Sequence, residues 1–116
     1  MERVGDEDLP ALMRHAAVFV YPAFAEGFGM PVAEAIASAV PVITSNTTSL
    51  PEVAGLAALA VNPHDVQALS AALTELLGKP DVAERLVAAG PDQLRPFDWE
   101  RSAQVLLRVV RSKFQA

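Results

Sequence analysis

Hydrophobic positions along the chain form three short, mainly apolar runs, separated by longer stretches in which apolar residues recur at helical spacing. The runs cover residues 17–21, 41–44 and 58–61. Such runs are typical of parallel strands buried beneath helices. Strands that alternate with helices predict right-handed crossovers and one parallel sheet. We therefore expect an α/β fold with about three parallel strands, flanking helices and a helical C-terminal region.

Capping residues and prolines set the expected helix boundaries. Asp6 or Asp8 begins a short helix with Leu9, Leu12, Met13 and Ala16 on one face. The following helices are expected over 31–38, 50–54, 65–77, 80–89 and 99–114. Gly55, Gly78 and Gly90 are expected to end three of them, and Asp98 to cap the last. Their apolar stripes comprise Val66, Leu69, Leu73 and Leu76; Val82 and Leu86; and Ala103, Leu106, Leu107, Val110 and Phe114.

The first strand begins at Ala17, ends at Tyr21 and runs into a turn marked by glycines, which is the best candidate for a binding site. Gly27 and Gly29 carry no Cβ, so the backbone can turn sharply and a ligand can come close. Pro31 suits the first turn of a helix, whose N–H groups then point back into the turn and favour phosphate oxygens. The sequence thus predicts an anion site at this helix start.

Two glutamates flank the turn, Glu26 before it and Glu34 one helical turn beyond it. Carboxylates repel a bare phosphate but accept hydrogen bonds from neutral hydroxyl groups, as on a ribose or a hexose. Together with the anion site, they indicate a nucleotide sugar. An ordinary turn followed by a glutamate that stabilises the helix dipole is the simpler alternative.

The run Glu26-Gly-Phe-Gly-Met-Pro-Val-Ala-Glu34, with seven residues between the glutamates, resembles the signature of the retaining group 1 glycosyltransferases of the GT-B fold. Further segments resemble the family in the same order, so the resemblance covers nearly the whole chain: Asp8 to Pro22, Val40-Pro-Val-Ile-Thr-Ser-Asn46, Ser49-Leu-Pro-Glu-Val-Ala-Gly55, Val61-Asn-Pro-His-Asp-Val66 and Phe97-Asp-Trp-Glu100. Ala39 and Leu56 depart from it, because the family usually has glycine at the first position and a small or acidic residue at the second.

The resemblance assigns Glu34 to the ribose hydroxyls of the nucleotide and Glu26 to the donor sugar, where Glu26 would also support positive charge at the anomeric carbon as the catalytic residue. It implies backbone contacts to the sugar and diphosphate from Gly27, Phe28, Gly29 and Met30. Ser45, Asn46 and Thr47 follow the end of a strand, where ligand sites of α/β proteins occur, and are further candidates for donor contacts. Plain loop chemistry explains these three equally well.

Composition and charge limit the function and location that we expect for the chain. A net charge of −5 disfavours nonspecific nucleic-acid binding, and 52% hydrophobic residues suffice for a core. The chain has no cysteine, its two histidines are too far apart in sequence to suggest a metal pair, and its N-terminus does not resemble a signal peptide. We expect a cytoplasmic protein that needs no cofactor, with the nucleotide sugar as substrate.

Three strands are half of a full doubly wound domain, which has six. We therefore interpret residues 1–116 as a single partial domain, the C-terminal half of a nucleotide-sugar-binding domain, with Met1 marking a truncation. The acceptor-binding N-terminal domain of an intact enzyme, and the phosphate-binding Arg and Lys that the family places upstream, would then be missing, and the isolated chain would not catalyse transfer.

Without the other half, strand 17–21 would be an unprotected apolar edge, so we expect self-association through it. The alternative is that the acidic N-terminal segment folds over this edge. Four residues near the C-terminus are basic: Arg101, Arg108, Arg111 and Lys113. We expect their side chains to face solvent. In an intact enzyme they could instead approach the other domain or an anionic membrane.

The sequence thus favours the donor-binding part of a glycosyltransferase. A non-catalytic half-domain that oligomerises or complements a partner chain is the second hypothesis. A sugar-phosphate-binding enzyme of another α/β class is the third.

Overall fold

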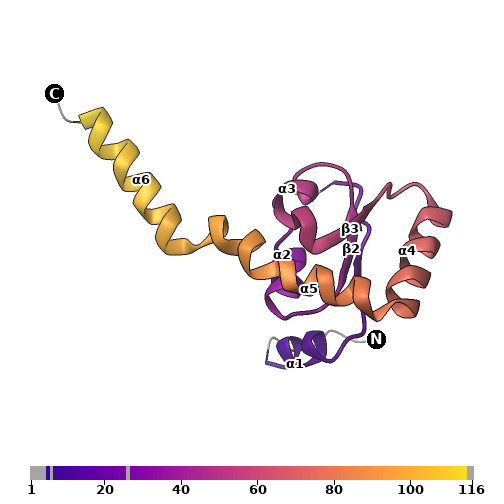
Figure 1. The fold of residues 1–116 in the computed structure, drawn as a ribbon. Coiled ribbons are helices and arrows are strands. Elements are labelled where there is room, and N and C mark those ends of the chain that lie inside the picture. Colours follow the sequence, from indigo (N-terminus) through magenta and orange to yellow (C-terminus); the bar gives the residue numbers. More distant parts are fainter. Residues whose placement is uncertain (1–4, 6, 26, 115–116) are drawn as a thin grey trace.

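The protein folds as a three-stranded parallel sheet with helices on both faces (Figure 1). The computed structural model describes residues 5, 7–25 and 27–114. The strands are β1 (Phe19–Tyr21), β2 (Val42–Ser45) and β3 (Ala58–Val61), in the order β1-β2-β3. The α-helices are α1 (Leu9–Arg14), α2 (Met30–Ala37), α3 (Leu50–Ala54), α4 (Val66–Gly78), α5 (Pro80–Leu94) and α6 (Trp99–Phe114). This arrangement confirms the predicted α/β fold.

Strand β2 lies at the centre and is buried along its whole length. Its register with the outer strands pairs Val42 with Phe19 on one side and with Ala58 on the other. Because successive side chains point to opposite faces, Val42 enters one hydrophobic cluster and Ile43 the other. Continuous burial on both faces explains why this strand carries no polar alternation.

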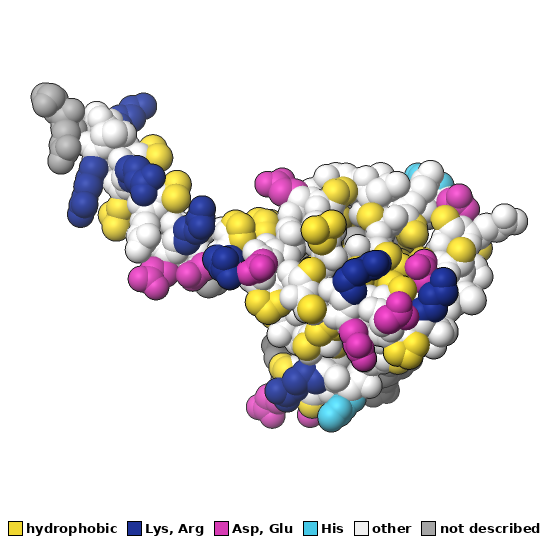
Figure 2. Space-filling model, in the orientation of Figure 1, with side chains coloured by type: hydrophobic (Ala, Val, Ile, Leu, Met, Phe, Trp, Pro, Cys, Tyr) yellow, Lys and Arg dark blue, Asp and Glu magenta, His cyan; other side chains and the backbone are white. Residues whose placement is uncertain are grey.

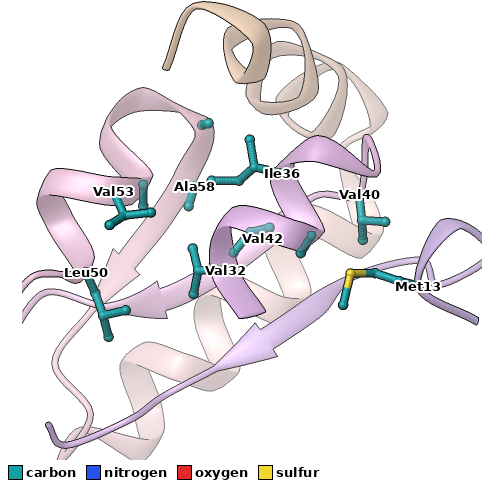
Figure 3. Packing of buried hydrophobic residues seen from close by; sticks show 11 residues of the cluster. Met13, Val32, Ile36, Val40, Val42, Leu50, Val53 and Ala58 are labelled. Carbon is teal, nitrogen blue, oxygen red and sulfur yellow. The ribbon is translucent and has the colours of Figure 1, made fainter. Parts of the chain in front are cut away.

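One face of the sheet is covered by α2 and α3, the other by α4. In Figure 3, Val32 and Ile36 of α2 and Val53 of α3 point into the space beside Val42. Met13 brings α1 to the same cluster, although the predicted neighbours Leu9 and Leu12 remain exposed. On the other face Leu76 of α4 is buried, whereas Val66, which was expected in the same stripe, is exposed.

Helix α5 does not end at Gly90 as the sequence predicted but continues through Pro91 to Leu94. Gly90 is buried against α2, and a Cβ there would lie only 3.0 Å from Cγ2 of Ile36. The glycine therefore allows two helices to pack closely instead of ending one of them. Past the proline, Gln93 donates hydrogen bonds to the carbonyls of Glu52 and Val53, and Leu94 packs against the hydrophobic cluster that contains Ile36.

Helix α6 projects away from the body of the protein (Figure 1). Its start follows the prediction, because the carboxylate of Asp98 accepts a hydrogen bond from the Glu100 N–H. The expected apolar stripe, however, is not buried against the described part of the chain, since Leu106 is 64% and Leu107 52% exposed. None of the described helices has the length and apolarity that a membrane span requires.

Strand β1 is shorter than the predicted 17–21, because Ala17 and Val18 lie outside its pairing with β2. It still forms one edge of the sheet. The predicted cap Asp6 lies outside the described residues, and the side chain of Asp8 caps no N–H of α1. Leu56, one of the two departures from the family pattern, is 83% exposed.

Candidate functional site

The turn between β1 and α2 has the backbone geometry that its glycines predicted. Gly29 immediately precedes the helix with φ 90° and ψ 47°, in the left-handed region that only glycine enters at little cost. Its carbonyl accepts the first helical hydrogen bonds, from the N–H groups of Val32 and Ala33. Among the described residues, no side chain forms a capping hydrogen bond at this helix start.

Gly27 lies in open space, because a Cβ added there would meet no atom within 4 Å. The fold of the described chain therefore does not need glycine at this position for room. The conformation of Gly29 thus favours glycine, and the space at Gly27 leaves the backbone there open to approach.

Glu34 lies one turn inside α2, as predicted, and is exposed. It lines a pocket of about 520 Å³ together with Phe28, Met30 and Phe97, and none of the residues that line this pocket is basic. The two phenyl rings meet edge to face, with their centroids 5.3 Å apart. Within the described part of the chain Glu34 forms no ion pair, so its carboxylate can accept hydroxyl donors.

Glu26, the predicted catalytic residue, lies outside the described residues. The pairing of the two glutamates therefore stays a prediction. The backbone on either side of this position is exposed at the carboxyl edge of the sheet, at Ala25 and Gly27. This is the edge at which α/β proteins bind ligands.

The three residues predicted to contact the donor at the end of β2 differ in their burial and hydrogen bonding. Ser45 is fully buried, and its hydroxyl donates a hydrogen bond of 2.6 Å to the carbonyl of Ala23. Asn46 is exposed and its backbone N–H donates to the carbonyl of Val61. The hydroxyl oxygen of Thr47 is buried and has no hydrogen-bond partner among the described residues. Only Asn46 thus has an exposed side chain that a ligand can reach directly, whereas the hydroxyl groups of Ser45 and Thr47 are buried.

Two residues that the sequence did not single out meet at the same edge. The ring of Phe24, in the loop after β1, stacks on His64, in the loop after β3, with centroids 4.7 Å apart. Both follow the end of a strand, a position typical of ligand sites, and His64 also lies in a segment that resembles the family. Their contact links two loops across the carboxyl edge of the sheet.

Gln93 is a third residue that the sequence did not single out. It donates hydrogen bonds from Nε2 to the carbonyls of Glu52 and Val53, at 3.0 and 3.1 Å, at the end of α3. Gly55 follows in a conformation with φ 48°, and a Cβ there would overlap the Gln93 side chain. Glutamine and glycine therefore fit together and anchor the helix that follows the Asn46–Thr47 loop.

The chain is similar to known proteins of one family. Residues 1–93 match the family model described as Glycosyl transferases group 1. The O-antigen chain mannosyltransferase B of Escherichia coli is 50% identical over 97 residues, which cover 84% of this chain and 26% of that protein. The MMP alpha-(1->4)-mannosyltransferase of Mycolicibacterium hassiacum is 38% identical over 104 residues, covering 86% and 25%.

Among solved structures, sucrose-phosphate synthase from Thermosynechococcus elongatus superimposes with a TM-score of 0.81 at 31% identity. The match covers 98% of this chain and 29% of that one. The chain thus spans about a quarter of the length of the curated relatives named above.

Proposed function

The chain belongs to the group 1 glycosyl transferases, and on that premise we propose that it is the donor-binding half-domain of a retaining enzyme of the GT-B fold. Such an enzyme transfers a sugar from a nucleotide diphosphate sugar to an acceptor with retention. The names of the two mannosyltransferase relatives favour mannose as the sugar. We assign residues 1–116 to the second half of the nucleotide-sugar-binding domain.

The observation that carries this proposal is the turn at the carboxyl edge of the sheet, where a backbone turn at Gly29 opens a helix with Glu34 one turn inside. The helix start offers N–H groups and a positive dipole end to phosphate oxygens. The exposed carboxylate of Glu34 can accept two hydroxyl donors at once, which suits the vicinal diol of a ribose. Sugar and phosphate recognition thus lie within one helical turn.

We assign the remaining donor contacts to residues at the same edge of the sheet. Glu26 contacts hydroxyls of the donor sugar and supports positive charge at its anomeric carbon. The backbone of residues 27–30 binds the sugar and diphosphate, and the open space at Gly27 leaves room for this approach. Asn46 supplies a polar side chain from the next strand end.

We do not expect the isolated chain to transfer a sugar. None of the described residues that line the pocket beside Glu34 is basic, so none of them can neutralise a diphosphate there. The chain also spans only about a quarter of the length of the two mannosyltransferase relatives. We expect weak donor binding and no turnover.

Calorimetric titration of the chain with GDP-mannose and UDP-glucose tests the proposal. We expect weak binding of at least one of them, and an affinity at least about tenfold lower in Glu34→Gln, because hydrogen bonds to a carboxylate contribute about 1.5–3 kcal/mol. Glu84→Gln is the matched control, since Glu84 is exposed on α5 and does not line the pocket beside Glu34. Equal affinity in Glu34→Gln and in the unchanged chain would count against the donor site.

A second candidate function, a non-catalytic half-domain that oligomerises, is favoured by one observation. Strand β1 is an edge of the sheet and pairs only with β2 within the described chain. An apolar edge of this kind is a template for pairing with another copy. Binding of a nucleotide sugar separates the two candidates, because a donor-binding half-domain can also pair through this edge.

A further inference from the structure

Strand β1 ends at Tyr21, one residue before Pro22. Backbone pairing of β1 with β2 covers three residues and stops at Tyr21, which lies opposite Thr44. Two side-chain hydroxyls of β2 bond to backbone carbonyls at this end of β1 and just after it. Thr44 donates to the carbonyl of Tyr21 at 3.1 Å, and Ser45 donates to the carbonyl of Ala23 at 2.6 Å.

The two hydroxyls have different effects. Thr44 bonds to the residue directly opposite it in the register, so its hydroxyl reinforces a pair that already exists. Ser45 reaches past Pro22 to a residue outside the strand. It therefore fixes a part of the chain that backbone pairing does not hold.

The burial of Ser45 makes this bond hard to replace. Its side chain has no accessible surface, and a buried hydroxyl without a partner costs about 1–3 kcal/mol. Rotation of the hydroxyl away from Ala23 is thus disfavoured, and the carbonyl is held at one position. A second contact holds the adjacent residue, because Phe24 stacks on His64 from the loop after β3.

We propose that Ser45 is a positioning residue for the donor site. Its hydroxyl, assisted by the Phe24 and His64 pair, sets where the chain leaves the sheet on its way to the turn at residues 27–30. The orientation of the backbone N–H groups of Gly27 to Met30 then depends on a residue that does not touch the donor. This inference rests on the proposed function.

Two substitutions with similar chemistry separate positioning from stability. Ser45→Ala and Thr44→Val each remove one buried hydroxyl and one hydrogen bond. We expect both to lower the melting temperature, and Ser45→Ala alone to weaken binding of GDP-mannose or UDP-glucose about tenfold, the factor that corresponds to one hydrogen bond. If Ser45→Ala does not fold, Ser45→Cys provides a weaker donor at the same position.

Amide hydrogen exchange without any ligand gives a readout that does not depend on the proposed function. We expect faster exchange at residues 24–29 in Ser45→Ala than in Thr44→Val, relative to the amides of α4 in each variant. Ser45→Thr, which keeps the hydroxyl, should restore slow exchange. If the unchanged chain binds neither nucleotide sugar, the proposed function fails while the exchange result still decides the role of Ser45. Equal exchange in Ser45→Ala and Thr44→Val overturns the inference.

Discussion

Two of the described residues other than glycine have a positive φ angle, and only one of these positions was marked in the sequence. Ala39, at the end of α2, takes φ 60°, and Thr48, in the loop before α3, takes φ 57°. The resemblance to the family already marked Ala39 as standing where glycine is usual, and the structure supplies the reason. Nothing in the sequence marked Thr48, whose conformation is rare for a β-branched residue.

We predict that Ala39→Gly stabilises the protein by about 0.5–1 kcal/mol. Relief of the left-handed conformation contributes about 1–2 kcal/mol, and the greater entropy of glycine in the unfolded chain offsets part of it. Urea denaturation followed by circular dichroism measures the change. Ala71→Gly, on the exposed face of α4, is the matched control and should destabilise by about 1 kcal/mol. A loss of stability in Ala39→Gly would contradict the strain argument.

Among the elements, those with local signals at both ends were predictable and those set by distant contacts were not. Strand β3 and helix α3 have the bounds that the sequence predicted, since apolar runs and Gly55 mark them. Helix α5 was predicted to stop at Gly90, because the contact of that glycine with Ile36 is not visible in sequence. In the site, the turn at Gly29 was predictable from local residues. The bond from Ser45 to Ala23 was not, because it joins residues 22 apart.

The exposed stripe of α6 predicts a contrast between two leucines. Leu107→Ala should change the free energy of unfolding by no more than about 0.5 kcal/mol, because the side chain is 52% exposed. Leu86→Ala, at a site on α5 that is 3% exposed, should cost about 2–5 kcal/mol. Urea unfolding of both variants measures the contrast. A large loss in Leu107→Ala would mean that α6 packs on a surface in solution.

At the scale of the whole molecule, charge and shape are both unevenly distributed. Helix α6 carries four basic residues and one acidic residue, a net charge of +3, in a chain whose net charge is −5. Figure 2 shows the basic side chains along the projecting helix, with apolar side chains between them. The body of the protein therefore holds the negative charge and the candidate site.

We predict that the chain self-associates through the edge of β1. Sedimentation velocity should show a dimer that Ala17→Lys shifts toward monomer, because a charge beside an edge strand opposes pairing. Leu106→Glu, on the exposed face of α6, should leave the dimer unchanged. A monomer at all concentrations, or dissociation by Leu106→Glu alone, would contradict pairing at this edge.

The projection of α6 also affects how the protein moves through solvent. The molecule extends 59 × 31 × 29 Å, and its radius of gyration is 16.5 Å, whereas a compact domain of this length has about 13 Å. A monomer of this shape experiences more friction than a sphere of the same mass. It should therefore elute early from a gel-filtration column calibrated with globular standards, at a volume that suggests a larger particle. Elution volume alone would thus mistake one elongated copy for an assembly of compact ones.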